Sequence, residues 1–381
     1  MMEVSVVIPC LNEEKTITPC IKKAQESFRR SGLKGEVIVV DNGSTDRSAE
    51  IAASLGARVI AESRKGYGSA LRRGIEEAAG TYIIMGDGDN TYDFTEADKF
   101  VALLKQGYDL VMGSRFRGKI LLGAMTWSHR YIGNPILSGI LRIFFGGGVS
   151  DSHCGLRAFT KEAYKKMDLH ADGMEFASEM VIHALKKKVR IAELPIIYYP
   201  REGESKLSSF RDAWRHMRFM LLYSPNHLFL LPGFLAFTVG FLITIRFLFG
   251  PIEFAGRRWD IHVMVFSSLL AILGWEILNL GVCAKIFAHR IGLEESRITS
   301  RVLSLLSLER SIVIGLVFLL FGTGFAAYII GVWIAGNFGE LAQVKTGIVA
   351  MMLIALGIQT IFAAFLTSML QIRYSRENSR Y

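Results

Sequence analysis

The sequence predicts an α/β domain built on a mostly parallel sheet, followed by an all-α domain of four transmembrane helices. Up to about Pro225, short apolar runs alternate with polar helical stretches, which is typical of a parallel sheet covered by helices on both faces. Beyond Pro225 come four nearly uncharged runs, each long enough to cross a hydrocarbon core of roughly 30 Å. With 381 residues and 51% hydrophobic content, the chain is expected to be an integral membrane protein.

The first four apolar runs have the composition of buried strands. They lie at Val4–Pro9, Glu36–Asp41, Arg58–Ile60 and Thr81–Ile84. Polar residues gather where three of these runs end, namely Asn12 and Glu13 after the first, Asp41 at the end of the second, and Asp87 and Asp89 after the fourth. Because the carboxyl ends of parallel strands meet at one edge, where open α/β folds bind ligands, these residues predict one shared site.

The stretch Met85–Thr91 carries two carboxylates, Asp87 and Asp89, on either side of Gly88. Two acidic side chains this close together are costly unless a cation lies between them. Hard cations such as Mg²⁺ or Mn²⁺ prefer carboxylate oxygens together with a substrate phosphate. The alternative is a solvated acidic turn, but this pair closes an apolar strand and joins no hairpin. We therefore expect a divalent metal site here.

Two glycines, Gly66 and Gly68, open the helix that precedes the fourth strand. They either let the backbone approach a phosphate at a helix N-terminus or form a tight turn. The sequence lacks the full dinucleotide-binding fingerprint, which disfavours a nicotinamide or flavin enzyme.

Charge and cysteine usage indicate the compartment. The four cysteines show no metal-ligand spacing, which suits a reducing environment, and the segment Met1–Cys10 is strand-like and not a signal peptide. The first domain is therefore expected in the cytosol. The formal charge of +9 lies partly in arginines and lysines beside apolar helices, which favours anionic lipid over nucleic acid as a partner.

Several motifs together resemble glycosyltransferase family 2. They are Val7-Ile8-Pro9 with Asn12-Glu13, Val39-Val40-Asp41 with Gly43-Ser44, Asp87-Gly88-Asp89, and Gly113-Ser114-Arg115. The later motifs Gly155-Leu156-Arg157, Glu175-Phe176 and Gly203-Glu204-Ser205-Lys206-Leu207 narrow the resemblance to the polyprenyl-phosphate branch, the dolichol-phosphate mannose and glucose synthases. The resemblance implies a GT-A fold that transfers a sugar from a nucleotide diphosphate to a lipid phosphate.

The resemblance also implies roles for individual residues. Nucleotide-sugar binding is implied for Pro9, Leu11, Glu13, Val40, Asp41, Asp87, Gly88, Asp89 and Arg115. Metal binding is implied for Asp87, Asp89 and Thr91, where Thr91 replaces the Gln common in mannose synthases. Acceptor-phosphate binding is implied for Arg130, Arg157, Arg201, Ser205 and Lys206, although Arg130 stands among few motif residues and is better read as a surface cation. Arg201 lies two residues before Gly203, whereas the family's basic residue commonly lies three before.

The expected chemistry needs no general base, because a lipid monophosphate is already an anionic nucleophile. The charge that develops on the departing diphosphate must be stabilised, which a metal and cationic side chains do electrostatically. The catalytic residues are accordingly expected to be Asp89, Arg115, Arg201 and Lys206. Removing Arg115 or Lys206 is expected to damage transfer far more than folding.

The second half supplies the membrane attachment. The expected domains are 1–207, an amphipathic segment 208–227, four spans in 228–372, and a basic tail 373–381. The amphipathic segment either lies in the headgroup plane or packs on the first domain as a linker helix. Arginines lie mainly between spans two and three and after span four, so by the positive-inside rule the catalytic domain and both termini are cytosolic. The spans are expected at Leu228–Phe249, Val263–Phe287, Ile312–Ile334 and Thr346–Leu370.

Three functions compete. The preferred one is Mg²⁺- or Mn²⁺-dependent transfer of a hexose to a polyprenyl phosphate, with UDP-glucose slightly favoured over GDP-mannose because of Thr91 and the stretch 198–207. A processive polysaccharide synthase is disfavoured because its Gln-x-x-Arg-Trp motif is absent. A lipid-sugar flippase with a non-catalytic domain is disfavoured because the motif residues are intact. Glu276, inside the second span, is expected to bond Gln359 or to line a polar path. The sequence does not fix an oligomeric state.

Overall fold

The computed structural model describes residues 2–202, 209–290 and 307–371. Contacts divide the chain into two units, Met1–Met220 and Leu221–Tyr381. Helix α8 (Ser209–Leu222) therefore belongs mostly to the first unit, where His216 and Met220 are buried and Trp214 is 57% exposed. This packing favours the linker-helix interpretation of segment 208–227, and it moves the boundary of the first unit beyond residue 207.

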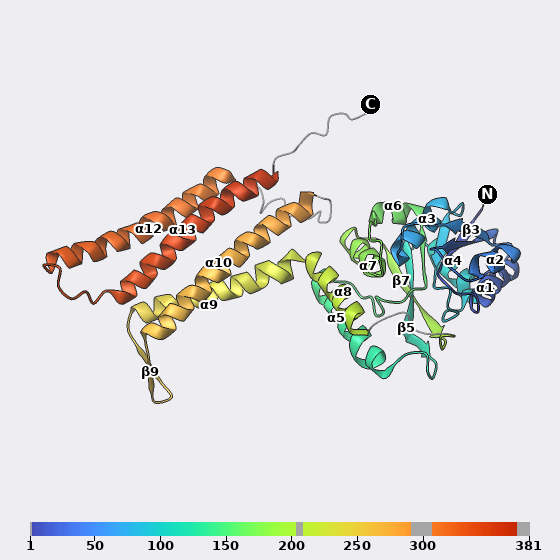
Figure 1. Cartoon of the computed structure of the whole chain (residues 1–381), viewed down its shortest axis with the longest axis horizontal. Helices are drawn as coiled ribbons and strands as arrows, with labels where there is room; N and C mark the ends of the chain where they lie inside the picture. The colour runs from blue at the N-terminus through green and yellow to red at the C-terminus, as the bar shows by residue number, and fades with distance from the viewer. Residues whose placement is uncertain (1, 203–208, 291–306, 372–381) are drawn as a thin grey trace, which may run out of the picture. The chain divides into compact units, whose positions relative to one another are not determined.

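The first unit is built on a seven-stranded sheet of order β3-β2-β1-β4-β6-β5-β7 (Figure 1). All pairings are parallel except those of β6, which runs antiparallel to both β4 and β5. The expectation of a mostly parallel sheet is confirmed, and β1–β4 begin and end within one residue of the expected bounds. The strands are β1 (Val4–Cys10), β2 (Gly35–Asp41), β3 (Arg58–Ala61), β4 (Tyr82–Met85), β5 (Leu110–Ile120), β6 (Arg157–Thr160) and β7 (Ile191–Tyr198).

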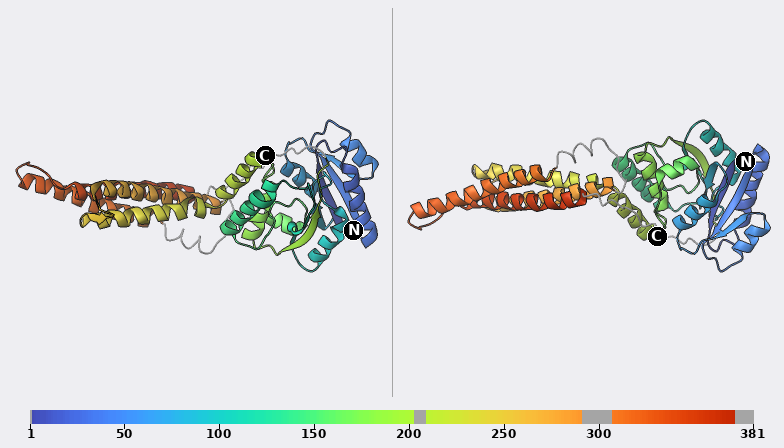
Figure 2. Two further views of the ribbon diagram at one scale, coloured as in Figure 1. Left: turned by 90° about the horizontal axis from the view of Figure 1, so that it is seen from below. Right: turned by 90° about the horizontal axis from the view of Figure 1, so that it is seen from above.

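Helices cover both faces of this sheet (Figure 2). On one face, alternate residues of β1 such as Val6 and Ile8 join a core with Ile21 of α1. On the other, a side chain at Gly74 of α3 would come within 2.5 Å of Val7, so α3 packs with its backbone close to the sheet. The helices are α1 (Ile17–Ser31), α2 (Ser48–Ser54), α3 (Tyr67–Glu77), η1 (Phe94–Glu96), α4 (Ala97–Lys105), η2 (His129–Gly133), α5 (Asn134–Phe145), α6 (Lys161–Met167) and α7 (Phe176–Lys186).

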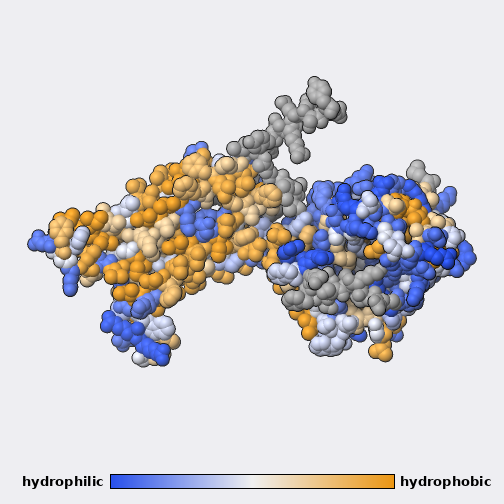
Figure 3. All heavy atoms as spheres, viewed as in Figure 1, coloured by the Kyte–Doolittle hydropathy of each residue, from blue (hydrophilic) through white to orange (hydrophobic). Residues whose placement is uncertain are grey.

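The described residues of the second unit contain four helices long and apolar enough to span a membrane, which confirms the four expected spans. Apolar residues dominate its surface, in contrast with the polar surface of the first unit (Figure 3). The spans are Asn226–Leu248, comprising η3 (Asn226–Leu230) and α9 (Leu231–Leu248), then α10 (Ile261–Arg290), α12 (Leu308–Ala335) and α13 (Val344–Gln371), with a hairpin of β8 (Ile252–Phe254) and β9 (Arg257–Trp259) after α9.

The spans pack closely through small residues. A side chain at Gly357 of α13 would lie 2.8 Å from the carbonyl oxygen of Gly315 in α12, which is the close backbone approach that membrane helices use. Between α10 and α13, the indole Nε1 of Trp275 donates a hydrogen bond of 2.9 Å to Thr360 Oγ1. Among the described residues, Gln359 Oε1 is buried without a hydrogen-bond partner. The bond between these spans is therefore made by Trp275 and Thr360, where the sequence suggested Glu276 and Gln359.

Candidate active site

The turns that follow β1 and β2 are bonded to each other at the carboxyl edge of the sheet. Asn12 adopts a left-handed conformation, with φ of 54°, and its side-chain oxygen accepts a hydrogen bond of 2.8 Å from the Thr45 backbone. The backbone N–H of Glu13 donates to Ser48 Oγ at 2.8 Å. The carboxylate of Asp41 accepts the Ser44 N–H at 3.0 Å. The first two bonds join the turn that carries Glu13 to the turn that follows Asp41.

The two carboxylates after β4 lie in different surroundings. Asp87 is half-buried and accepts a hydrogen bond of 2.9 Å from the Tyr67 hydroxyl. Burial, together with the negative charge of Asp89, raises the pKa of Asp87 from 3.8 to about 7. Asp89 is only 7% exposed and accepts a hydrogen bond of 2.6 Å from Thr91 Oγ1. The paired negative charge is thus poorly solvated, which favours binding of a cation.

Arg201 is the cation that faces this pair. Its guanidinium forms ion pairs with Glu13 at 3.6 Å and with Asp89 at 3.5 Å. Arg201 follows β7, whose end is held near Asp89 by a hydrogen bond of 3.0 Å from Tyr199 N–H to the Thr91 carbonyl. The structure therefore brings together Glu13, Asp89 and Arg201, three residues that are distant in the sequence.

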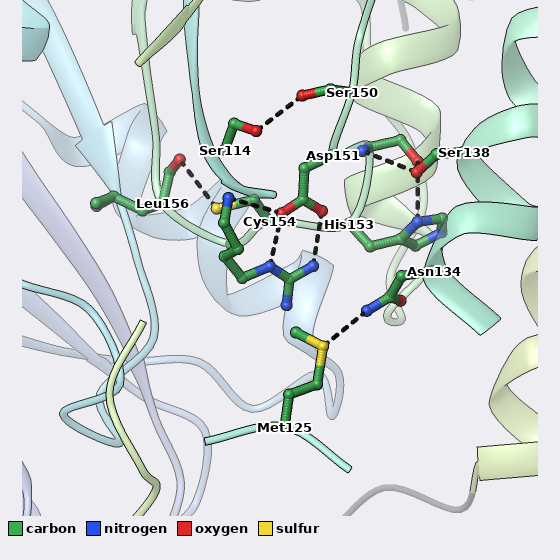
Figure 4. A network of polar contacts seen from close by, with 12 residues as sticks. Ser114, Met125, Asn134, Ser138, Ser150, Asp151, His153, Cys154 and Leu156 are labelled. Atoms are coloured by element: carbon green, nitrogen blue, oxygen red, sulfur yellow. Dashed lines mark hydrogen bonds and ion pairs between the residues drawn. The ribbon is translucent and has the colours of Figure 1, made fainter. Parts of the chain in front are cut away.

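Arg115 lies at the end of the apolar part of β5 and is bound to Asp151, a residue that sequence reasoning missed. Both are buried, at 6% and 0% exposure. Asp151, which Figure 4 labels, accepts hydrogen bonds from the Arg115 backbone N–H at 3.0 Å and from its Nε and Nη2 at 2.7 Å each. The guanidinium carbon of Arg115 also lies 5.2 Å from the centroid of the Tyr198 ring. The expectation that its removal would spare the fold is not supported, because Asp151 would remain buried and unpaired.

Arg157 does not face solvent, in contrast with its expected role at the acceptor phosphate. Its side chain is 0% exposed. Its Nε, Nη1 and Nη2 donate to the backbone carbonyls of Cys154, Ala177 and Ser152, at 2.9, 2.6 and 2.8 Å. With each of these nitrogens bonded to a carbonyl, Arg157 holds the loop before β6 against α7, and its assignment to the acceptor phosphate is a misreading of a structural cation.

The glycines at the start of α3 serve a close approach of two backbone segments. The N–H groups of Gly68 and Ser69 both donate to the carbonyl of Asp172, at 2.8 and 3.1 Å. A side chain at Gly66 or Gly68 would overlap the backbone of the 171–172 loop. A carbonyl therefore occupies the position that a phosphate would need, and the two glycines serve this close approach.

The remaining expected residues are distributed as follows. Pro9 is partly exposed, Leu11 is 37% exposed, and the Val40 side chain is buried in the sheet, so that Val40 can reach a nucleotide only through its backbone. Gly88 is buried beneath the site. Arg130 lies in η2 with its guanidinium carbon 5.3 Å from the Tyr131 ring centroid. Ser205 and Lys206 fall outside the described residues.

The donor set fits a hard divalent cation. Within the part of the chain that the structure describes, no group of three or more histidine, cysteine, aspartate and glutamate side chains is placed to hold a metal. The groups that would hold a cation here are the carboxylates of Asp87 and Asp89, with the Thr91 hydroxyl beside Asp89. Magnesium commonly takes one or two carboxylates from the protein and completes its shell with water and substrate phosphates. The site can accordingly hold a cation that arrives together with a phosphorylated substrate.

An Asp-x-Asp pair at the carboxyl edge of a mostly parallel sheet, in a chain that continues into four spans, defines a membrane-bound glycosyltransferase with the GT-A fold. The chain belongs to glycosyltransferase family 2. Residues 5–168 match the glycosyl transferase family 2 domain, and residues 282–371 match the C-terminal transmembrane region of the same family.

Relatives of known name share much of the sequence. The low-salt glycan biosynthesis hexosyltransferase Agl6 of Haloferax volcanii is 40% identical over 363 residues, covering 95% of this chain and 87% of the relative. A dolichyl-phosphate hexose transferase of the same organism is 32% identical, over 55% of this chain and 88% of the relative. Among solved structures, glucosyl-3-phosphoglycerate synthase of Mycobacterium tuberculosis is 24% identical, with a TM-score of 0.47 over 58% of this chain and 78% of the other.

Proposed function

We propose that this glycosyltransferase transfers a hexose from a nucleotide-diphosphate sugar to a polyprenyl phosphate at the cytosolic face of the membrane, with Mg²⁺ or Mn²⁺. The observation that carries the proposal is the pairing of Asp87 and Asp89 beside Arg201 at the ligand edge of the sheet. The relative that is named a dolichyl-phosphate hexose transferase supports a lipid phosphate as acceptor. UDP-glucose is the preferred donor and GDP-mannose the alternative, because Thr91 stands where mannose synthases commonly have Gln.

The reaction follows from the charges at the edge. An oxygen of the lipid phosphate attacks the anomeric carbon, a new C–O bond forms, and the bond from that carbon to the diphosphate breaks, releasing the nucleoside diphosphate. Asp87 and Asp89 hold the metal, which when bound neutralises charge on the leaving diphosphate. Glu13 and Asp41 contact the nucleoside. No side chain needs to accept a proton, since the acceptor oxygen is already anionic.

The basic side chains are proposed to bind different phosphate groups. Arg201 can exchange Asp89 and Glu13 for phosphate oxygens, because ion pairs of 3.5 and 3.6 Å are loose and the side chain is one-quarter exposed. Arg115 contributes through Nη1, the guanidinium nitrogen to which Asp151 does not bond. Lys206 and Ser205 are proposed to bind the acceptor phosphate, with Lys206 as its main cation.

One exposed surface of the first unit has the composition expected of a surface that contacts lipid, which supports a lipid acceptor. Between Leu122 and Ile143, six large apolar side chains are exposed, and residues 110–150 contain no aspartate or glutamate. Basic side chains are interleaved with them, which is the composition of a surface that lies against anionic headgroups. The six residues are Leu122, Trp127, Tyr131, Ile132, Ile136 and Ile143.

The test uses the full chain in lipid nanodiscs with Mn²⁺, an undecaprenyl or dolichyl phosphate, and a panel of radiolabelled nucleotide sugars. We expect label to enter the organic phase from UDP-glucose more than from GDP-mannose. Failure of every nucleotide sugar to label the lipid, in protein whose fold is intact, would overturn the proposal. Protease accessibility of tags at both termini in sealed vesicles checks the cytosolic orientation.

A further inference from the structure

Tyr67 is the first residue of α3 and lies between two glycines whose backbones are fixed. Gly66 has a φ of 143°, which favours glycine, and its N–H donates to Asn42 Oδ1 at 2.8 Å. The N–H of Gly68 is bonded to the carbonyl of Asp172. The backbone on both sides of Tyr67 is therefore held by partners from two other loops, and its ring has little freedom to move.

The Tyr67 hydroxyl reaches the first carboxylate of the Asp-x-Asp pair. It donates to Asp87 Oδ1 at 2.9 Å. On the other side of this carboxylate lies Gly155, where an added Cβ would be 2.7 Å from Asp87 Oδ2. The carboxylate is thus confined between a hydroxyl and a bare α-carbon. Within the described residues Oδ2 accepts no hydrogen bond, which leaves both of its lone pairs for a cation.

We infer that Tyr67 is a positioning residue for the metal, because its hydroxyl fixes the Asp87 carboxylate with Oδ2 directed at the cation. The inference rests on the proposed metal-dependent function and adds to it a residue that holds a ligand without touching the metal. Ligating carboxylates are commonly oriented by a hydrogen bond to their second oxygen, and loss of such a partner typically weakens metal binding by about 10- to 100-fold. The packing of Gly66 and Gly68 against the 171–172 loop then also holds this hydroxyl at Asp87.

The matched pair of variants is Tyr67→Phe and Tyr82→Phe. The first removes only the hydroxyl bonded to Asp87. The second removes a tyrosine hydroxyl at the other end of β4, away from the carboxyl edge of the sheet. A third variant, Gly155→Ala, presses a methyl group on Asp87 Oδ2 and disturbs the same carboxylate from its other side.

Mn²⁺ binding is measured by electron paramagnetic resonance on the full chain in nanodiscs, with UDP and, separately, GDP present. For Tyr67→Phe we expect the Kd for Mn²⁺ to rise about 10-fold at unchanged stoichiometry, with a rise also in Gly155→Ala and none in Tyr82→Phe. A folding defect instead lowers the number of sites and leaves their Kd unchanged.

A Kd in Tyr67→Phe within twofold of wild type, at full or reduced stoichiometry, would overturn the inference while leaving the proposed function standing. Wild-type protein that binds no Mn²⁺ with either nucleotide would overturn the proposed metal dependence, and this inference with it.

Discussion

Two arginine–aspartate pairs make the same hydrogen bonds but differ in burial, so comparing them measures how much burial adds to the contribution of such a pair to the unfolding free energy. Asp151 accepts the backbone N–H, Nε and Nη2 of Arg115, and Asp109 accepts the same three groups of Arg190. The side chains of the first pair are 7% and 0% exposed, and those of the second 67% and 32%. Replacing either aspartate with asparagine removes the charge at nearly constant shape.

The two substitutions should lower the unfolding free energy by amounts that differ severalfold. Asp151→Asn leaves Arg115 as an uncompensated buried cation, which costs about 3–5 kcal/mol of unfolding free energy. Asp109→Asn breaks a solvated pair and costs about 0.2–1 kcal/mol. With an m-value of about 2–3 kcal/mol/M, the first change lowers the urea midpoint by about 1–2.5 M and the second by less than about 0.5 M. Pulse proteolysis of the first unit in the full chain measures both. Equal midpoints in the two variants would refute the argument from burial.

Three further outcomes are expected. Asp89→Ala should reduce transfer at least about 100-fold without unfolding the chain, since it removes a metal ligand at the sheet edge, and full turnover in excess chelator would contradict this. Burial, followed by the neighbouring His216, lowers the pKa of His153 well below 6.5, so His153 stays neutral when folded and protonates when unfolded. Below pH ~6.5 His153 should therefore lower the unfolding free energy of the first unit, by up to about 1.4 kcal/mol per pH unit, while Asp87, with its raised pKa, acts in the opposite sense. The unfolding free energy should therefore fall less, or rise more, in His153→Gln than in wild type as the pH is lowered from 7 to 5; identical pH slopes in the two proteins would count against it. Glu276→Gln removes an ionisable group from inside a span, so it should alter mainly the thermal stability of the spans and keep transfer to a short-chain acceptor. Unchanged stability with loss of long-chain acceptor use in bilayers would instead give the spans a direct part in handling product.

Strands β1–β4 and the Asp-x-Asp pair were predictable because their evidence is local in the sequence. Each strand is an apolar run, and the two carboxylates follow β4 within four residues. Strand β6 has only four residues, and its first, Arg157, is a charged residue that is fully buried. Neither its strand character nor its burial can be read from composition, because the burial of the guanidinium depends on three backbone carbonyls, and composition does not show where backbone carbonyls point.

The partners of the site residues were not predictable for a related reason. Tyr67 bonds a carboxylate 20 residues away, and Asp151 bonds an arginine 36 residues away, so both contacts exist only after the sheet has formed. The two glycines that flank Tyr67 marked this position in the sequence as one with unusual backbone requirements. No motif in the sequence marked Asp151. The exposed apolar surface from Leu122 to Ile143 was also missed, because its spacing resembles that of an ordinary buried helix, and only the fold shows these side chains exposed among the described residues.

The most direct test of the account follows two labels from one donor. The central claim is that the lipid phosphate attacks the anomeric carbon, so the product keeps the lipid's own phosphate and receives only the sugar. The full chain is incubated with a polyprenyl phosphate, Mn²⁺ and UDP-glucose that carries ¹⁴C in the glucose and ³²P in the β-phosphate. The account predicts a lipid product that contains ¹⁴C and no ³²P. A lipid product that contains both labels would show transfer of a sugar phosphate and would contradict the claim.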